Sequence, residues 1–176
     1  MGNIYLVGFM GTGKTAVGQE LARQKKRCFV DLDQLIELKE KRVISEIFAK
    51  EGEPYFRKVE SQTLKEIARE KNFVVACGGG IVINPYNIRL MKASGVIICL
   101  GASCEVILKR TVRFNHRPLL NVADPKKQIE LLLKLRAPYY ARADYTIDTS
   151  RLSVKQAVAK IIKLTARKAK KPRPKK

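Results

Sequence analysis

No apolar run in this chain of 176 residues approaches the roughly 18 residues that a membrane-spanning helix needs, so we expect no membrane association. The C-x-x-C spacing of zinc and redox sites is also absent. The four cysteines lie in or beside apolar stretches, and we interpret them as reduced thiols in the core: Cys28, Cys77, Cys99 and Cys104. Because the chain begins directly with an apolar strand and shows no basic or apolar leader, we expect a cytoplasmic protein.

Acidic residues are scarce, with 16 Asp or Glu against 36 Lys or Arg and a formal net charge of +20. The excess is uneven, because residues 149–176 hold 11 basic residues and no acid, which leaves +9 for residues 1–148. No aromatic residue follows Tyr145, so the basic end offers no platform for stacking bases. We therefore expect no specific nucleic-acid partner. The charge of the remaining chain suits a domain that binds ATP and a second anion.

The length is that of one domain, and the order of elements along it predicts an α/β protein. Short apolar runs predict five strands, at residues 4–7, 28–30, 73–77, 95–100 and 145–147. Helical spacing predicts helices over residues 14–23, 32–36, 43–71 (in two pieces, broken at Gly52 and Pro54), 104–109, 125–139 and from 154 onward. Strands that are apolar throughout are typical of a parallel sheet with helices on both faces, which makes three layers.

Two segments fall outside this regular alternation. Residues 111–123 are polar, basic and proline-containing, so we expect a mobile surface loop there. The apolar face of the last helix ends after Lys163. We therefore expect one domain over residues 1–165, followed by a flexible basic tail over residues 166–176.

Residues 8–15 fit the phosphate-loop pattern G-x-x-x-x-G-K-[ST] at every fixed position, directly after a strand and directly before a helix. Glycines let the backbone wrap around phosphates with its N–H groups pointing inward, and the helix N-terminus adds partial positive charge. We predict that Lys14 bridges the β and γ phosphates of ATP and that the Thr15 hydroxyl binds Mg²⁺. The predicted nucleotide-binding residues here are Gly11, Thr12, Gly13, Lys14, Thr15 and Ala16. The alternative is a glycine-rich turn that merely precedes a helix.

Two carboxylates, Asp31 and Asp33, follow the second predicted strand, at the edge where parallel sheets bind their ligands. Asp31 is also suited to cap the next helix, with Gln34 three residues later. Two negative charges beside a phosphate pocket are costly unless a cation or an exchangeable proton is present. We therefore assign Asp31 to the Mg²⁺ side, through water, and Asp33 to a substrate hydroxyl. The only histidine, His116, lies in the polar loop, so we expect the general base to be a carboxylate.

Further motifs give the chain a resemblance to the shikimate kinase family over about residues 3–150. They are the phosphate loop, Asp31 and Asp33, F-x-x-x-G-E-x-x-F-R-x-x-E over residues 48–60, Gly78-Gly79-Gly80, R-P-L-L over residues 117–120 and R-x-x-x-Y over residues 136–140. Many kinases share the phosphate loop, whereas the segment 48–60 with the glycine run is far more specific. The resemblance implies a P-loop kinase fold with a lid, and transfer of phosphate from ATP, with Mg²⁺, to the 3-hydroxyl of shikimate.

For the substrate, the resemblance implies that Arg57 and Arg136 bind the shikimate carboxylate, a role that suits a guanidinium fork. An ion pair of Arg57 with Glu53 or Glu60 is the alternative, and the two roles are compatible because Glu60 can orient Arg57. The resemblance also implies that Asp33 contacts the ring hydroxyls and takes the proton of the attacking one.

The remaining substrate residues implied by the resemblance are the glycine run, Gly78, Gly79 and Gly80, and two phenylalanines. The backbone at Gly79 is expected to reach the substrate, whereas the alternative is a tight turn that needs positive φ. Phe48 and Phe56 are expected to form an apolar wall for the ring, and core packing explains either residue equally well.

For the nucleotide, the resemblance implies that residues 111–123 form a lid that closes over ATP and excludes water. Arg117 is then expected to meet the γ-phosphate in the transition state, with a solvated loop arginine as the alternative. Arg110 is expected to lie against the adenine and Arg151 to serve the same side. The chain departs from the family pattern at Arg142, where the family usually has an acid.

Two other functions compete with phosphorylation of shikimate. Another small P-loop kinase, acting on gluconate or a nucleoside monophosphate, would share the phosphate loop, but base-reading groups and a longer lid are not evident. A nucleic-acid-binding protein that uses ATP as a switch would account for the basic C-terminal residues, which suggest only non-specific attraction to phosphate. We expect a monomer whose partner is a small-molecule substrate.

Overall fold

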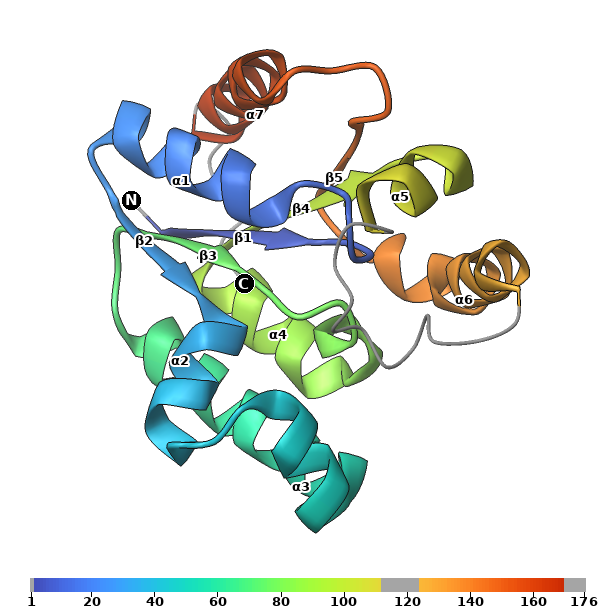
Figure 1. Ribbon diagram of the computed structural model, residues 1–176. Helices are drawn as coiled ribbons and strands as arrows, with labels where there is room; N and C mark the ends of the chain where they lie inside the picture. The colour runs from blue at the N-terminus through green and yellow to red at the C-terminus, as the bar shows by residue number, and fades with distance from the viewer. Residues whose placement is uncertain (1, 112–123, 170–176) are drawn as a thin grey trace.

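A single parallel sheet organises the structure, a computed structural model that describes residues 2–111 and 124–169 (Figure 1). Its five strands are β1 (Asn3–Val7), β2 (Cys28–Asp31), β3 (Phe73–Ala76), β4 (Gly95–Gly101) and β5 (Tyr145–Asp148). Their order across the sheet is β2-β3-β1-β4-β5, and each neighbouring pair is parallel. The predicted α/β class and five-stranded parallel sheet are confirmed.

Helices cover both faces of the sheet. They are α1 (Lys14–Lys25), α2 (Leu32–Glu40), α3 (Ile44–Arg69), the 3₁₀ turn η1 (Ile81–Ile83), α4 (Pro85–Ser94), α5 (Cys104–Thr111), α6 (Pro125–Tyr140) and α7 (Val154–Ala169). Figure 1 shows α1 and α7 on one side of the sheet and α3 and α4 on the other, which gives the predicted three layers.

The core consists of two clusters of buried apolar side chains, one on each face of the sheet. Along β1, Ile4 and Leu6 belong to the cluster that includes residues of α1 and α7, whereas Tyr5 and Val7 belong to the opposite cluster. Because successive side chains of a strand point to opposite faces, a central strand with both faces covered must be apolar throughout. Each fully buried Leu or Ile contributes about 1.5–3 kcal/mol. Cys77 and Cys99 are buried in the core as expected and Cys104 is half-buried, but Cys28 is exposed at the start of the edge strand β2, so the expectation of a core position is wrong for Cys28.

The helix α4 and the turn η1 were not predicted from the sequence, although α4 carries ordinary start signals. The Asn84 side chain accepts a hydrogen bond from the Tyr86 N–H, and Pro85 occupies the first turn of α4. Buried Ile88 and Met91 then pack α4 onto the sheet before β4 begins. The short apolar run after the glycines concealed this start.

The two predicted pieces of the helix over residues 43–71 are confirmed, because α3 is kinked at Gly52, where φ is +79° and ψ is 172°. The last helix, α7, extends to Ala169, beyond the end of the apolar face expected at Lys163, and Leu164 packs against the core cluster. The domain boundary at residue 165 stays a prediction.

The carboxyl ends of all five strands meet at one edge of the sheet. Gly8 follows β1, Asp31 ends β2, and Gly78 follows β3, while Thr149 follows β5. The residues predicted from separate motifs therefore gather at this edge, which is where open parallel sheets bind ligands. Within the part of the chain that the structure describes, no helix combines the length and apolar character needed to cross a membrane.

Candidate active site

The glycine loop between β1 and α1 has positive φ angles at three of its glycines. Gly8, Gly11 and Gly13 have φ values of +138°, +74° and +92°, in a region that other residues rarely adopt. The buried Thr12 hydroxyl donates to the Phe9 carbonyl over 2.7 Å, which fixes the turn. The Lys14 Nζ donates to the carbonyls of Gly8 and Phe9, both at 3.0 Å. The loop thus presents one lysine and the first N–H groups of α1 to a ligand, as phosphate binding requires.

Thr149 holds the glycine loop in place through hydrogen bonds, and it was not predicted from the sequence. Its hydroxyl lies 3.0 Å from the Thr12 carbonyl oxygen and 2.9 Å from that of Gly101. The Arg110 guanidinium donates to the carbonyls of Gly11 and Thr149, both at 3.1 Å. Thr149 is 3% exposed, and a threonine directly after a strand at the ligand edge is the signal that identifies it. Arg110 therefore lies beside the glycine loop, and its role against adenine stays a prediction.

The Asp31 carboxylate forms the predicted cap of α2 and also contacts Thr15, while its role on the Mg²⁺ side stays a prediction. Its Oδ1 accepts hydrogen bonds from the N–H groups of Asp33 and Gln34, at 3.2 and 3.5 Å, so Asp31 caps α2. Its Oδ2 accepts a hydrogen bond from the Thr15 hydroxyl over 2.9 Å. The cap and the contact with Thr15 therefore coexist, one on each carboxylate oxygen.

The pair formed by Thr15 and Asp31 fits Mg²⁺. This ion commonly takes one or two protein oxygens and completes its shell with water and substrate phosphates. Within residues 2–111 and 124–169, no group of three or more His, Cys, Asp or Glu side chains is placed to hold a metal ion. A cation here would therefore depend on the nucleotide for most of its ligands.

Asp33 lies in the first turn of α2 with its side chain directed into the protein. Its Oδ1 is buried and has no hydrogen-bond partner among the described residues. Burial raises the pKa of Asp33, the negative charge of Asp31 raises it further, and the positive charge of Lys14 lowers it. A buried carboxylate oxygen without a partner is costly, so this oxygen is suited to accept a hydrogen bond from a ligand hydroxyl.

Arg57 and Glu60 form a partly buried ion pair on α3. The Arg57 Nη1 donates to Glu60 Oε2 over 2.8 Å, and the Nε and Nη2 donate to Glu53 Oε1, both at 3.0 Å. Glu60 is 1% exposed, and burial raises its pKa to about 7, although the charge of Arg57 acts in the opposite direction. The predicted ion pairs of Arg57 are therefore confirmed.

Glu60 was predicted only to orient Arg57, and no contact with a ligand was predicted for it. Its Oε1 is buried and has no hydrogen-bond partner within the described part of the chain, as is true of Asp33 Oδ1. The signal for Glu60 is an acid on the side of α3 that also buries Phe56, Thr63 and Leu64. An acid is rarely buried without a partner, so this position indicates a site rather than a surface.

The glycine run lacks side chains because charged groups crowd it. None of the three glycines has φ in the left-handed region, so the alternative of a turn that needs positive φ is wrong. A Cβ at Gly78 would lie 2.8 Å from Asp33 Oδ1 and 2.9 Å from Glu60 Oε1. A Cβ at Gly80 would lie 2.7 Å from the Arg57 Cζ. The run therefore leaves room for one aspartate, one glutamate and one arginine.

Arg136 and Tyr140, both on α6, reach the middle of the glycine run. The Tyr140 hydroxyl donates to the Gly79 carbonyl over 2.8 Å, and burial raises the pKa of Tyr140 to about 12. A Cβ at Gly79 would lie 3.4 Å from Arg136 Nη1. The Arg136 guanidinium also lies over the Phe9 ring, 5.6 Å from its centroid. Arg57 and Arg136 thus approach the glycine run from different helices, and Tyr140 holds that run in place.

The two predicted phenylalanines lie together. The ring centroids of Phe48 and Phe56 are 4.8 Å apart, and the rings are tilted by 38°. Phe56 is 4% exposed and belongs to the core, whereas Phe48 is 37% exposed. Core packing therefore explains Phe56, over which the Arg57 Cζ lies 5.2 Å from the ring centroid, but not Phe48.

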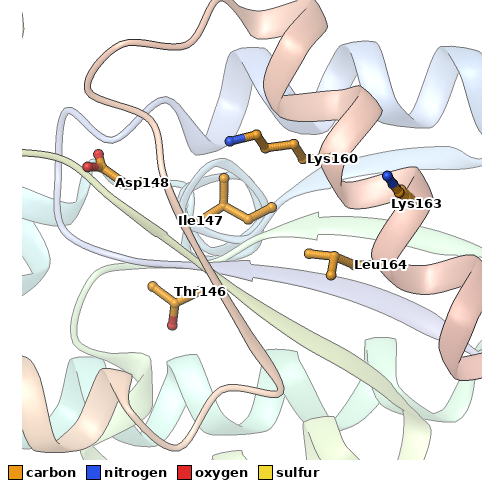
Figure 2. A pocket seen from close by; sticks show the side chains of 6 residues that line it. All are labelled: Thr146, Ile147, Asp148, Lys160, Lys163 and Leu164. Carbon is orange, nitrogen blue, oxygen red and sulfur yellow. The ribbon is translucent and has the colours of Figure 1, made fainter.

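The other predicted nucleotide residues are Arg117 and Arg151. Arg117 and His116 lie outside the described residues, as does nearly all of the predicted lid. Arg151 is exposed after β5. Figure 2 shows a cavity between β5 and α7, and no residue predicted for the site lines it. Its lining consists of Thr146, Ile147, Asp148, Lys160, Lys163 and Leu164.

A phosphate loop and a separate cluster of an acid, two arginines and three glycines share one sheet edge. This arrangement defines a P-loop protein that binds a nucleotide and a small anionic second ligand. A family model for shikimate kinase matches residues 10–166.

Individual shikimate kinases are also similar to this chain in sequence and in structure. Shikimate kinases from Thermoanaerobacter pseudethanolicus and Caldanaerobacter subterraneus are 45% and 47% identical to this chain, over 93% of it and 95% of each relative. The structure of shikimate kinase from Acinetobacter baumannii in complex with shikimate superposes with a TM-score of 0.92 at 41% identity, over 97% of this chain and 96% of that chain. The chain belongs to the shikimate kinase family.

Proposed function

We propose that this protein transfers the γ-phosphoryl group of ATP to the 3-hydroxyl of shikimate. The observation that carries the proposal is the convergence of Asp33, Arg57 and Arg136 on the glycine run, at the sheet edge that also holds the phosphate loop. A hydroxy acid needs both a cationic group for its carboxylate and an acceptor for its hydroxyl proton. The cluster offers both, and the glycines leave space beside them.

The acceptor would be held mainly by its charge. Arg57 and Arg136 would bind the carboxylate from two helices, and the Glu60 ion pair would keep the Arg57 guanidinium oriented toward Gly80. Phe48 would cover one face of the ring. Holding the hydroxyl beside the phosphate loop converts an encounter between two substrates into a reaction within one complex, which removes much of the entropic barrier.

Proton transfer is assigned to Asp33. As the hydroxyl oxygen forms its bond to the γ-phosphorus, the bond from that phosphorus to the bridging oxygen of ADP breaks, and Asp33 takes the hydroxyl proton. Lys14 and the N–H groups of the glycine loop would stabilise the charge on the phosphates. Thr15 and Asp31 would hold Mg²⁺, which neutralises phosphate charge when it is bound. Arg117 is proposed to meet the γ-phosphate.

ATP turnover with a panel of acceptors tests the proposal. ADP formation is measured with MgATP and shikimate, gluconate or AMP, on the intact protein, on Asp33→Asn and on Glu46→Gln, an exposed carboxylate control. With MgATP, we expect turnover with shikimate but not with gluconate or AMP. Asp33→Asn should lose about 10²- to 10⁴-fold in this turnover and still bind the nucleotide, and the control should keep the wild-type rate. Faster turnover with gluconate or AMP would show that shikimate is not the acceptor. Full activity of Asp33→Asn would show that Asp33 is not the general base.

A cytoplasmic location and a monomeric state are part of the same proposal.

A further inference from the structure

Phe9, the second residue of the glycine loop, has a buried ring although it belongs to a loop at the ligand edge. The residue is 1% exposed, and the Arg136 Cζ lies 5.6 Å from the centroid of its ring. A guanidinium within about 6 Å of an aromatic face is attracted by the negative charge of that face. The contact therefore joins the glycine loop to α6.

The backbone of Phe9 makes a second connection, to the phosphate side of the loop. Its carbonyl accepts hydrogen bonds from the Thr12 hydroxyl over 2.7 Å and from the Lys14 Nζ over 3.0 Å. Phe9 thus contacts the lysine assigned to the phosphates through its backbone and the arginine assigned to the acceptor through its ring.

Arg136 also lies close to the glycine run. A Cβ at Gly79 would lie 3.4 Å from Arg136 Nη1 and 3.5 Å from the Gly8 carbonyl oxygen. The Phe9 ring and the middle of the glycine run therefore both lie near the same guanidinium. A change in the loop backbone at Phe9 would be felt directly by Arg136.

We propose that Phe9 is a positioning residue whose ring holds Arg136 toward the glycine run, so that a nucleotide in the glycine loop and a carboxylate on Arg136 influence each other's affinity. This inference rests on the proposed function, because it takes Arg136 as a carboxylate-binding group. Coupling of this kind is reciprocal, so either ligand must change the affinity for the other by the same factor.

Calorimetric titration of shikimate, with and without saturating ADP and Mg²⁺, tests the inference on the full chain. Phe9→Leu keeps an apolar side chain but removes the aromatic face. We expect it to lower shikimate affinity by about 3- to 30-fold, as the loss of one cation–π contact implies, and to bring the ratio of affinities with and without ADP closer to one. ADP affinity without shikimate should change by less than about 2-fold, because the phosphate contacts come from the backbone and Lys14.

Tyr139→Leu is the matched control. The Arg142 Cζ lies over the Tyr139 ring, 5.4 Å from its centroid, so this variant removes a similar pair at the C-terminal end of α6, between side chains for which no site role is predicted. We expect it to change neither the shikimate affinity nor the ratio. Equal losses in the two variants, or an unchanged affinity ratio in Phe9→Leu, would overturn the inference.

If the proposed function is wrong, the shikimate titrations give a different result from the one expected if only the coupling is wrong. In that case the wild-type protein would not bind shikimate, or Arg136→Ala would bind it as tightly as the wild type does. If the wild-type protein binds shikimate with the same affinity in the presence and absence of ADP, the coupling is refuted while the acceptor assignment stands.

Discussion

Gly78 lies where two buried carboxylates converge. The unpartnered oxygens of Asp33 and Glu60 both approach the position that a side chain at Gly78 would occupy. Burial raises the pKa values of both Asp33 and Glu60. The positive charges of Lys14 and Arg57 lie nearby and oppose this rise for Asp33 and Glu60, respectively. Glycine at this position therefore serves the carboxylates, not a special backbone conformation.

Gly78→Ala should leave the fold intact and impair the reaction. The added methyl would meet only the ends of the Asp33 and Glu60 side chains, at 2.8 and 2.9 Å, and these can move aside. Displacing a catalytic carboxylate by about 1 Å costs about 100-fold, which we expect in kcat/KM for shikimate. In Gly101→Ala, where an added Cβ has no neighbour within 4 Å, kcat/KM should stay within about 2-fold. Equal activities of the two variants would contradict the role of Gly78.

Glu60 should make stability depend on pH. Burial raises its pKa from 4.5 to about 7, so the folded protein binds this proton more tightly than the unfolded chain. The stabilisation from proton binding is fully present below pH 4.5 and is lost as the pH rises to about 7. We expect this carboxyl to reduce the free energy of unfolding by up to about 3 kcal/mol across that window.

Urea unfolding of the wild type and of Glu60→Gln at pH 5 and pH 8 measures this effect. The amide does not titrate, so the difference in unfolding free energy between the two proteins should shift in favour of the variant at pH 8. A constant difference at the two pH values would show that Glu60 is ionised throughout.

At the scale of the elements, α2 begins at a residue that also serves the phosphate loop. One oxygen of Asp31 caps the helix, and the other accepts from Thr15 on α1. A single carboxylate therefore sets the distance between the start of α1 and the start of α2. The strand ends are coupled through such residues, and Thr149 does the same between β5 and the glycine loop.

Asp31→Asn separates the two roles. Asparagine caps a helix as well as aspartate does, so thermal unfolding should be nearly unchanged. Because the negative charge near the cation is lost, the Mg²⁺ concentration for half-maximal activity should rise about 10-fold or more. Asp31→Ala should show the same Mg²⁺ effect together with a loss of about 1 kcal/mol in stability. An unaltered Mg²⁺ requirement in both variants would remove Asp31 from the metal side.

The elements that were predicted correctly are those whose local signals are consistent. The strand, glycine loop and helix around Lys14 agree in pattern and position, and the break at Gly52 follows from its backbone freedom. The helix α4 was missed because Ile81, Val82 and Ile83 before it give a short apolar run, which does not distinguish a strand from a buried turn. The order of strands in the sheet depends on contacts between distant residues, which no local pattern contains.

At the scale of the whole molecule, the positive charge is concentrated in the last part of the sequence. Residues 149–176 hold 11 of the 36 basic residues and no acid. We expect removal of residues 170–176 to leave kcat and both KM values within about 2-fold, because the described site draws on residues 8–149. Steady-state kinetics on the shortened chain checks this, and a large loss of turnover would assign the tail to the reaction.

Motifs in the sequence name Lys14, Asp33 and Arg57 as candidates, and the fold brings these residues to the same edge of the sheet. Thr149 was not found in this way, and the motif gave Glu60 only as a partner of Arg57, because burial and contacts across the sheet edge appear only in the folded chain. The contact of Phe9 with Arg136 likewise joins residues from two distant segments. A motif identifies the groups that touch ligands, whereas the groups that hold them in place emerge only in the folded chain.

Recognition of the acceptor carboxylate by two arginines beside the glycine run is the central claim. It is tested most directly by comparing kcat/KM for shikimate with kcat/KM for its methyl ester, which keeps the ring and hydroxyls but loses the charge. Hydrogen bonds to charged groups contribute about 1.5–3 kcal/mol each, so the ester should be a poorer substrate by about 100-fold or more. Equal values for the acid and the ester would contradict the account.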